Sequence, residues 1–519
     1  MEMTQGFDRR TLLRAGMVGV GATAAGLVVP AAAQAAPLVR AGRPVLTHGV
    51  QSGDVTRDGA LVWTRADRPS RMLVEVSRDP SFRQASRTLR GPVLTPDTDG
   101  TGKLRLTGLP PGREVFYRVR AEDLDGRAAS EPLTGSFRTA PAGPADVRFT
   151  WSGDVAGQGW GINPDIGGMT GYAAMAARRP DFFIHSGDAV YSDGPLQATV
   201  TLPDGRVWHN LVTPEKSKVA ESLAEYRGQF AYNLLDVNMR TFAASVPAYV
   251  QWDDHEVLNN WYPGEILDLP QYTEKRVDVL AARAFQAFHE WQPVDPRRAV
   301  DGRVHRSFGY GPHVDIFILD MRSYKDPNTS PKDGAGHILG ERQARWLVDG
   351  LSRSRATWKI IANDLPLGLV VPDGPTDIEG VANGLPGAPG GREHELAWVL
   401  RQLAARRVRN VVWLTADVHY TAAHHYSPDR AAIADFHPFW EFVSGPLHAG
   451  AFGPNALDPT FGPRAVFTHA PPAPNTSPLD GFQHFGEVEI DGRTRELTVH
   501  LRDGRGTALW STTLTPRRP

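Results

Sequence analysis

The stretch Asp181-Phe182-Phe183-Ile184-His185-Ser186-Gly187-Asp188-Ala189-Val190-Tyr191 decides the fold. Its first five residues, with the apolar run Phe182-Phe183-Ile184 at their centre, are of the kind that forms a buried strand. The run ends at Ser186-Gly187-Asp188, where glycine lets the backbone bend tightly before a charged side chain. In α/β proteins the carboxyl ends of strands form the ligand crevice, so this pattern predicts a functional site at the edge of a sheet.

Short apolar runs alternate with longer helical stretches from residue 146 to residue 516. Further buried strands are predicted at 147–151, 248–252, 314–319, 358–362 and 410–414. Helical spacing separates them at 173–178, 216–242, 273–291, 340–352 and 393–406. Antiparallel strands at 486–490, 496–502 and 508–514 are expected to finish the domain. This order predicts a layered α/β catalytic domain over 146–516.

Polar clusters follow four of the other strands, and sheet geometry predicts that they converge with Asp188. They are Ser152-Gly153-Asp154, Asp253-Asp254-His255-Glu256, Asn363-Asp364 and Asp417-Val418-His419. Crowded carboxylates repel one another and take up protons, whereas cations turn the same crowding into binding. Because the chain has no cysteine, the metal ligands are oxygen and nitrogen atoms, a set that suits Ca²⁺, Mn²⁺, Fe³⁺ or Zn²⁺.

Such a cluster suits the hydrolysis of a phosphate ester. Two cations roughly 3.5–4 Å apart bind phosphoryl oxygens and lower the pKa of a bound water to about 7. Asp188, on its tight turn, is predicted to bridge the two metals. His255 is predicted to be the catalytic residue, which protonates the leaving oxygen or binds the phosphoryl group.

Residues 1–35 have the pattern of a twin-arginine signal peptide. Arg9-Arg10 precede an uncharged run over 15–29, and small residues follow through Ala35. We therefore expect the chain to pass through the twin-arginine export machinery. Its expected location is periplasmic, in the cell wall or extracellular.

Residues 43–140 form short alternating apolar runs with turns about every ten residues, which predicts a small all-β sandwich of the immunoglobulin or fibronectin type. Residues 139–145 are interpreted as a linker. The formal net charge of −2 provides no basic field for nucleic acid. The sequence carries no signal for an oligomeric state, and a monomer is expected.

Several blocks, in the same order, resemble the PhoD-type alkaline phosphatases. In the N-terminal part they are Thr47–Asp54 and Leu61–Arg65, and in the catalytic part His185–Tyr191, Trp252–Val257, Leu319–Arg322, Trp358-Lys359 and Asp417–Tyr420. The resemblance implies a calcineurin-like metallophosphoesterase core with four αββα layers, preceded by the small sandwich. It also implies hydrolysis of phosphomonoesters, and in some relatives phosphodiesters including phospholipids, with Fe³⁺ and Ca²⁺ as the metals.

Carried over position by position, the resemblance makes Asp188 a bridging ligand, Tyr191 a ferric-iron ligand through its phenolate, and His255 the catalytic histidine. Better-known members have Ser-Cys-Gln after the first strand, with the cysteine on iron, whereas this chain has Ser152-Gly153-Asp154. A carboxylate is thus predicted to replace the thiolate. The predicted metal ligands are Asp154, Asp188, Tyr191, Asp254, Asp364, Asp417 and His419.

Some assignments and functions stay open at this level. Asn363 competes with Asp364 as the ligand after the fifth strand, and Asn363 and Asp253 are otherwise expected to orient a ligand or to contact substrate. A phosphodiesterase or phospholipase D-like activity is the main alternative, since two-metal sites cleave either ester. A non-catalytic exported binding protein is a third possibility, although the predicted site is complete. Five histidines are interpreted as surface or loop residues: His424, His425, His437, His448 and His484.

Overall fold

A computed structural model of the chain describes residues 42–83 and 85–517. The predicted signal peptide at 1–35 therefore lies outside the described residues. Within those ranges, no helix combines the length and the apolar character needed to cross a membrane.

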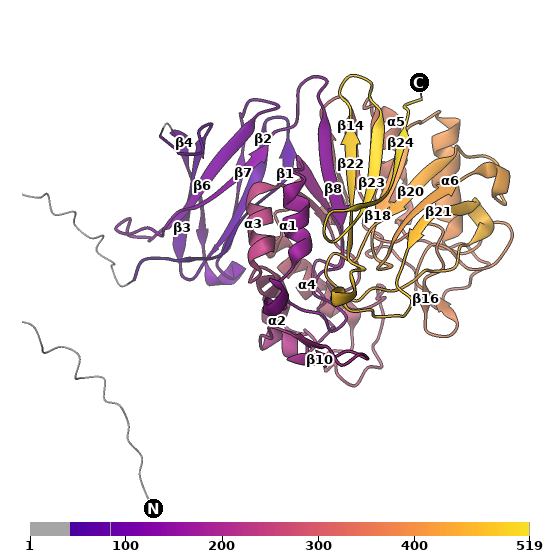
Figure 1. Ribbon diagram of the computed structural model, residues 1–519, viewed down its shortest axis with the longest axis horizontal. Helices are drawn as coiled ribbons and strands as arrows, with labels where there is room; N and C mark the ends of the chain where they lie inside the picture. The colour runs from indigo at the N-terminus through magenta and orange to yellow at the C-terminus, as the bar shows by residue number, and fades with distance from the viewer. Residues whose placement is uncertain (1–41, 84, 518–519) are drawn as a thin grey trace, which may run out of the picture. The chain divides into compact units, whose positions relative to one another are not determined.

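Two large sheets build the body of the protein (Figure 1). The nine-stranded sheet runs in the order β24 (Ala508–Leu514), β23 (Leu497–Asp503), β22 (His484–Ile490), β8 (Val147–Ser152), β9 (Phe182–Ser186), β12 (Ala248–Gln251), β1 (Leu46–Thr56), β2 (Gly59–Ala66) and β5 (Thr101–Leu106). The seven-stranded sheet runs in the order β13 (Arg306–Tyr310), β14 (Val314–Ile318), β15 (Trp358–Ala362), β18 (Val411–Thr415), β20 (Phe439–Val443), β19 (Thr421–Tyr426) and β21 (Pro463–His469).

Side-chain alternation along the strands explains why the two sheets stack. In β15, Ile360 and Ala362 belong to the hydrophobic core shared by both sheets, whereas Ile361 packs in a second core with the helices. In β9, Ile184 faces the shared core, and Phe183 faces helices on the other side of its own sheet. Because successive residues of a strand point to opposite faces, each central strand is apolar on both faces.

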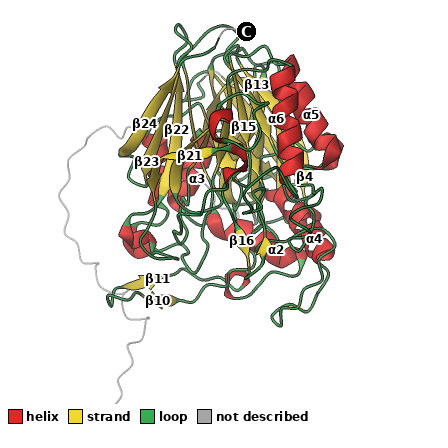
Figure 2. Ribbon diagram, turned by 90° about the vertical axis from the view of Figure 1, so that its right-hand side faces the viewer, coloured by secondary structure: helices red, strands yellow, loops and turns green. Residues whose placement is uncertain are grey.

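Helices cover the outer face of each sheet. Those against the nine-stranded sheet are α1 (Thr170–Ala177), α2 (Leu223–Asn233), α3 (Val237–Ser245) and α4 (Val277–Trp291), and those against the seven-stranded sheet are α5 (Gly340–Arg353) and α6 (Glu393–Ala405). Figure 2 shows α5 and α6 side by side over their sheet. The predicted four-layer αββα arrangement is confirmed. The single helix predicted at 216–242 is wrong: it is two helices, because Asp236 caps α3 by accepting a hydrogen bond from the Met239 amide at 2.9 Å.

The N-terminal all-β part shares a sheet with the catalytic part. Its four-stranded sheet has the order β4 (Ala85–Leu94), β3 (Ser70–Ser77), β6 (Glu114–Glu122) and β7 (Leu133–Arg138). Its other strands, β1, β2 and β5, extend the nine-stranded sheet, since β1 pairs in parallel with β12 at Gly53 and Ala248. A Cβ on Gly53 would lie 2.3 Å from the Pro293 carbonyl oxygen, so only glycine permits this junction. The sequence-based boundaries, 43–140 and 146–516, stay predictions.

Two small hairpins lie in the long loops near the carboxyl ends of the central strands. One pairs β10 (Thr199–Thr201) with β11 (Val207–His209), and the other pairs β16 (Pro372–Asp373) with β17 (Asp377–Ile378). The second hairpin is held by the Asp373 carboxylate, which accepts hydrogen bonds from the Asn260 and Asn328 side chains at 2.9 and 2.8 Å. Its loop therefore lies beside the turn that follows β12.

Candidate metal centre

The predicted acidic residues follow strands of both sheets. Asp154, Asp188 and Asp254 come after β8, β9 and β12, which are neighbours in the nine-stranded sheet. Asp417 and His419 come after β18 of the other sheet. The carboxyl ends of these strands therefore meet where the two sheets face each other, as sheet geometry predicted.

An unusual backbone places these side chains. Asp154, Asp188, Asp417 and His419 all have positive φ, at 63°, 50°, 62° and 60°. Each such residue costs on the order of 1–3 kcal/mol, and such strain gathers at functional sites. Gly187 has φ 98°, and a Cβ there would lie 2.4 Å from the Asp253 Cβ. The tight turn expected before Asp188 is thus present.

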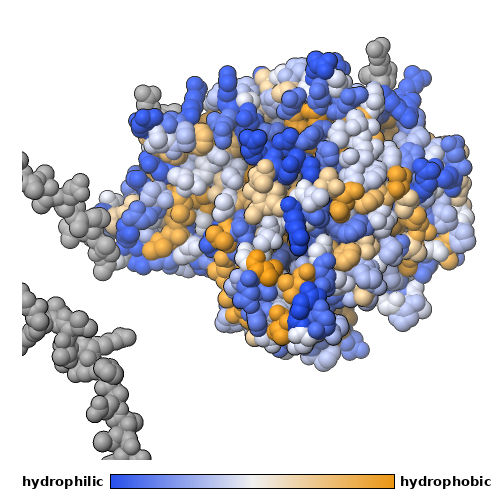
Figure 3. Space-filling model, in the orientation of Figure 1, coloured by the Kyte–Doolittle hydropathy of each residue, from blue (hydrophilic) through white to orange (hydrophobic). Residues whose placement is uncertain are grey.

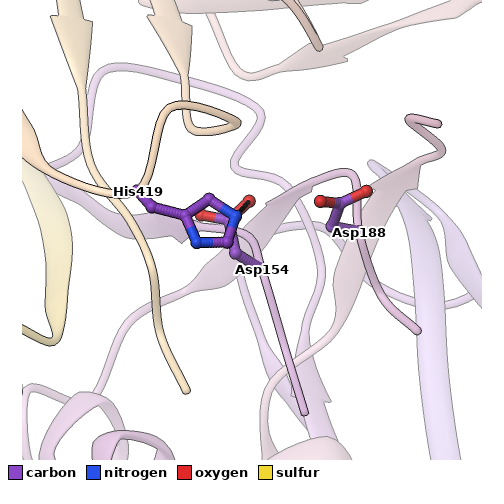
Figure 4. A group of neighbouring side chains, drawn as sticks. All are labelled: Asp154, Asp188 and His419. Atoms are coloured by element: carbon purple, nitrogen blue, oxygen red, sulfur yellow. Dashed lines mark ion pairs between the residues drawn. The ribbon is translucent and has the colours of Figure 1, made fainter. Parts of the chain in front are cut away.

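Three groups of ligand atoms converge, each with its atoms within 4.8 Å of one another. The groups are Asp154 with Asp188 and His419, Asp188 with Asp254 and His255, and Asp253 with Asp254 and Asp417. Figure 4 shows the first group, with two carboxylates from the first half of the chain and an imidazole from the last. Asp188 and Asp254 each belong to two groups, so neighbouring positions share ligands.

The site's chemistry fits cations. One buried carboxylate oxygen of Asp154, of Asp253 and of Asp417 has no hydrogen-bond partner. Burial raises the pKa of Asp154 to about 8. Burial and the charges of Asp254 and Asp253 raise the pKa of Asp188 well above its usual value. Carboxylates that cannot ionise together without a counter-charge are the donor set that a pair of cations satisfies.

Tyr191 and His419 form one wall of the site. The Tyr191 hydroxyl lies 2.7 Å from His419 Nε2, and His419 Nδ1 faces the Gly450 carbonyl. Because Nδ1 must donate to that carbonyl, Nε2 accepts from the Tyr191 hydroxyl and is the ring nitrogen whose lone pair can bind a cation instead. Burial and the Asp188 charge raise the pKa of Tyr191 well above its usual value, so without a cation it keeps its proton. The Tyr191 hydroxyl oxygen and His419 Nε2 are therefore two possible ligand atoms for a cation beside Asp154.

His255 is held by a residue that the sequence analysis missed. Its Nδ1 lies 2.7 Å from Asp193 Oδ1, and Asp193 also accepts a hydrogen bond from the Asn259 amide at 2.8 Å. Burial lowers the pKa of His255, but Asp193 and Asp254 outweigh it and raise the pKa to about 9. Asp193 stands two residues after Tyr191. Its closeness to the predicted metal ligands was the feature of the sequence from which its role could have been predicted.

Family comparisons agree with this geometry. The family model described as PhoD-like phosphatase matches residues 149–501. The chain belongs to the PhoD-like phosphatase family. The model of the family's N-terminal domain matches residues 31–141. The predicted resemblance is confirmed, and the chain is a phosphoric ester hydrolase.

Individual relatives support the same family assignment. The chain is 28% identical over 432 residues to alkaline phosphatase D of Bacillus subtilis (strain 168), which covers 78% of this chain and 70% of that protein. A structure of PhoD matches with a TM-score of 0.69 and 22% identity over 91% of this chain and 90% of that one. The purple acid phosphatase PPD1 from yellow lupin (Lupinus luteus) seeds matches with a TM-score of 0.57 and 14% identity over 91% and 74%. The two structural matches show the fold.

A buried arginine completes the acidic centre of this family member. Arg322 Nε lies 2.5 Å from Asp253 Oδ1, and its NH2 nitrogen (Nη2) lies 3.7 Å from Asp254 and 3.6 Å from Asp417. Its other terminal nitrogen contacts Glu379, which follows the β16–β17 hairpin. The sequence analysis quoted Arg322 in a motif without a role and missed Glu379, whose loop carried no recognisable pattern. Arg322 balances part of the buried negative charge.

The remaining predicted residues lie apart from the three groups. The Asp364 carboxylate accepts a hydrogen bond from the Met321 amide at 2.9 Å. The Asn363 amide donates to the Leu365 carbonyl at 2.8 Å and to Glu441 at 3.3 Å. Both side chains therefore brace the loop after β15, and neither joins a ligand group among the described residues. Asp253, by contrast, joins one and also pairs with Arg322.

The interpretation of five histidines as surface or loop residues is wrong for two of them, since His424 is buried in β19 and His484 is buried in β22. His448 lies in a loop as predicted, although it too is buried. His424, His448 and His484 are 1%, 3% and 0% exposed. His448 Nε2 bonds the Gly161 carbonyl at 2.9 Å, and His484 Nδ1 bonds the Gly445 carbonyl at 3.1 Å. Buried backbone carbonyls need donors, and imidazole supplies one at little cost in charge.

Proposed function

We propose that this phosphoesterase hydrolyses phosphate monoesters at two adjacent cation positions that share Asp188. The observation that carries the proposal is the overlap of the ligand groups: Asp188 links the Asp154–His419 group to the Asp254–His255 group, and Asp254 links the latter to Asp253 and Asp417. The monoester assignment is supported by the similarity to a protein named alkaline phosphatase D.

The two positions differ in donor type. Asp154, His419 and Tyr191 offer a carboxylate, an imidazole and a phenolate, which suit Fe³⁺, Mn²⁺ or Zn²⁺. The second position combines Asp188 with Asp254, and Asp253 and Asp417 add carboxylates that Arg322 partly neutralises. Carboxylate oxygens suit a hard cation such as Ca²⁺. We assign a transition metal to the first set and Ca²⁺ to the second. In this chain Asp154 takes the place that better-known members give to cysteine.

Bound cations supply Lewis acidity and a water acidic enough to attack at neutral or alkaline pH. The chain's own residues do the rest. Asp193 fixes the tautomer and direction of His255, whose ring also lies against the Tyr191 ring with centroids 4.2 Å apart. With a pKa raised to about 9 by Asp193 and Asp254 against the effect of burial, His255 carries the proton that a leaving alkoxide needs.

Glu256 sets the spacing of the ligand loops. Its two oxygens accept hydrogen bonds from the Ala189 amide at 2.7 Å and the Asp253 amide at 2.8 Å. One buried carboxylate thereby ties the loop that carries Asp188 to the loop that carries Asp254. Fixed spacing of this kind is what a site for an in-line displacement requires.

The test of the substrate assignment compares p-nitrophenyl phosphate with bis-p-nitrophenyl phosphate across pH, using one preparation of known metal content. The proposal predicts a kcat/KM at least about tenfold higher for the monoester. The reverse preference would assign the same site to phosphodiester hydrolysis. Absence of hydrolysis of both esters by metal-loaded protein would remove the proposed function.

We also propose export by the twin-arginine route, supported by Arg9-Arg10 and the uncharged run that follows. The test is fractionation of cells that express the chain with Arg9→Lys and Arg10→Lys together. The expected result is retention of the variant in the cytoplasm, with the unmodified chain outside it. Equal export of both would contradict the proposed route.

A further inference from the structure

A wide groove crosses the end of the two sheets that is remote from the metal centre. It has a volume of about 970 Å³ and is lined by the turns before β15 and β18, the β22–β23 turn and the C-terminal segment. Six exposed arginines stand along it: Arg355, Arg406, Arg407, Arg493, Arg495 and Arg517. We call this feature the arginine groove. Strand β24, which leads into this groove, ends at the upper edge of the molecule in Figure 1, and Figure 3 shows hydrophilic side chains along that edge.

The charge of the arginine groove is strongly one-sided. Arg409 and Lys359 also line it, and Glu496 is its one acidic lining residue. Arg406 pairs with Asp349 at 2.6 Å. Among the described residues, the other five exposed arginines have no acidic side chain within ion-pair distance. A protein with a formal net charge of −2 thus concentrates unneutralised positive charge in one concave surface.

A second groove near the same edge shows that this imbalance is local. It has a volume of about 680 Å³ and contains three arginines, Arg138, Arg148 and Arg179, against five acids, Asp146, Asp181, Glu489, Asp491 and Glu496. Arg138 pairs with Asp181 at 3.3 Å, and Arg148 pairs with Glu489 at 2.8 Å. Neighbouring surface of the same protein therefore has no excess of positive charge.

Hydrogen bonds hold the walls of the arginine groove in place. The Trp358 indole donates to the Arg495 carbonyl at 2.8 Å, which fixes the β22–β23 turn against β15. The Asn410 side chain donates to the Arg517 carbonyl at 3.0 Å and accepts from the Arg517 amide at 2.8 Å. The arginines are therefore mounted on backbone that is already ordered, which reduces the entropy lost on binding.

Two of the arginines stand where glycine is the easier residue. Arg407 has φ 57° and Arg495 has φ 64°, in the left-handed region that favours glycine. These positions keep a long cation despite the backbone preference. They also allow the charge to be removed by a substitution that the backbone accepts.

The arginine groove is separate from the metal centre. Asn410 precedes β18 and Asp417 follows it, and the β22–β23 turn lies beside the start of β8, whose end leads to Asp154. A five-residue strand is roughly 16 Å long, so the two sites lie at opposite ends of the same strands. A ligand in the groove does not reach the metals.

We propose that the arginine groove binds a linear polymer of phosphate groups. Arginine forms charge-assisted, often bidentate, hydrogen bonds with phosphate oxygens. Cations spread over four separate segments match a chain of repeated charges better than one isolated phosphate. A concave groove suits a strand-like polymer better than the flat surface of a bilayer. The groove holds such a polymer while the metal centre at the other edge stays accessible.

The test measures binding of long-chain inorganic polyphosphate by calorimetry at several salt concentrations. Orthophosphate is kept in excess throughout, so that the metal centre does not contribute. The variant is Arg407→Gly with Arg495→Gly. The expected result is about tenfold weaker binding and a salt dependence, log Kd against log salt, reduced by about one unit for each arginine removed. Hydrolysis of p-nitrophenyl phosphate by the variant is expected to be unchanged.

Arg179→Gly is the matched control, because Arg179 has φ 53° and lines the second groove, where acids outnumber arginines. It is expected to leave polyphosphate binding unchanged. Three results would overturn the proposal: no polyphosphate binding, equal binding by the double variant and the unmodified chain, or equal losses in the double variant and the control. Binding to phosphatidylglycerol vesicles without binding to polyphosphate would assign the groove to a membrane surface instead.

Discussion

The two ends of strand β18 differ in how they carry charge. At its carboxyl end, Asp417 joins buried acids, some of whose oxygens have no partner. At its amino end, Arg407 and neighbouring arginines lie in water. Burying a charge without a partner costs several kcal/mol, whereas an exposed arginine costs little. The acidic end therefore requires a ligand to be stable, and the basic end is stable without one.

The largest effect on activity is expected from a substitution in the acidic centre. Asp188→Asn removes the carboxylate that two ligand groups share. We expect kcat/KM for p-nitrophenyl phosphate to fall by about a thousandfold or more, because cations at such sites contribute several kcal/mol to the transition state. Metal analysis is expected to show lost metal. Asp125→Asn, at an exposed turn, is the control, and a similar loss there would discredit the assignment.

Removal of the metals is expected to make the stability of the protein depend more strongly on pH. In the metal-free fold Asp154 has a pKa of about 8, raised by burial, and Glu256 has one of about 7, also raised by burial. The folded protein then holds protons that the unfolded chain has lost, so the free energy of unfolding falls as pH rises through these values. His255, raised to about 9 against the effect of burial by Asp193 and Asp254, acts in the same direction above pH 6.5.

The measured quantity is the difference in unfolding free energy between metal-loaded and metal-free protein. We expect it to grow by about 1–3 kcal/mol between pH 6.5 and 9, since a bound cation keeps the carboxylates ionised. Lys103 and Lys216, whose pKa values burial lowers to about 7, act in the opposite direction but are present in both forms. Their contribution cancels in the difference. A difference independent of pH would contradict the charge assignment of the acidic end.

A smaller effect is expected from Asp193→Asn, because Asp193 acts through His255. We expect a loss of about tenfold to a hundredfold in kcat, comparable with the removal of residues that orient metal ligands. The alkaline limb of the pH profile should move to lower pH, since the pKa of His255 loses its largest raising interaction. Asp193→Glu is expected to restore part of the activity. An unchanged pH profile would limit Asp193 to a structural role.

The smallest effect belongs to the basic end. Arg407→Gly is expected to change kcat/KM for p-nitrophenyl phosphate by less than about twofold, because the groove lies at the other end of the strands. The free energy of unfolding is expected to change by less than about 1 kcal/mol, in the stabilising direction, since glycine relieves the left-handed backbone. A large loss of activity would show that the groove and the metal centre are functionally coupled, which would contradict this account.

Much of the fold was predictable from sequence because its central strands are apolar on both faces. The runs at 147–151 and 358–362 lie within β8 and β15, in agreement with the apolar pattern. The last two strands of the seven-stranded sheet, β19 and the edge strand β21, were missed, since their mixed composition lacks such a run. The junction of β1 with β12 was also missed, because a parallel pairing between residues nearly 200 positions apart leaves no local pattern.

The acidic site was predictable where ligands directly follow strands. Asp154, Asp188 and Asp417 lie in the groups that strand order predicted. Glu379 could not be found in this way, because a loop without periodicity brings it to Arg322. The arginine groove was hidden as well, since its cations come from three separate turns and the C-terminal segment, and the net charge of the whole chain does not show such a local excess. Sequence reveals charge that follows one strand more readily than charge assembled across several loops.

Metal titration of the purified chain tests the central claim most directly. The protein is stripped of metal, verified by elemental analysis and assayed with p-nitrophenyl phosphate while Fe³⁺, Ca²⁺, Mn²⁺ or Zn²⁺ is restored singly and in pairs. We predict no hydrolysis without metal and activity that rises in proportion to bound metal, with two ions per chain at saturation. Full hydrolysis by verified metal-free protein would contradict the account.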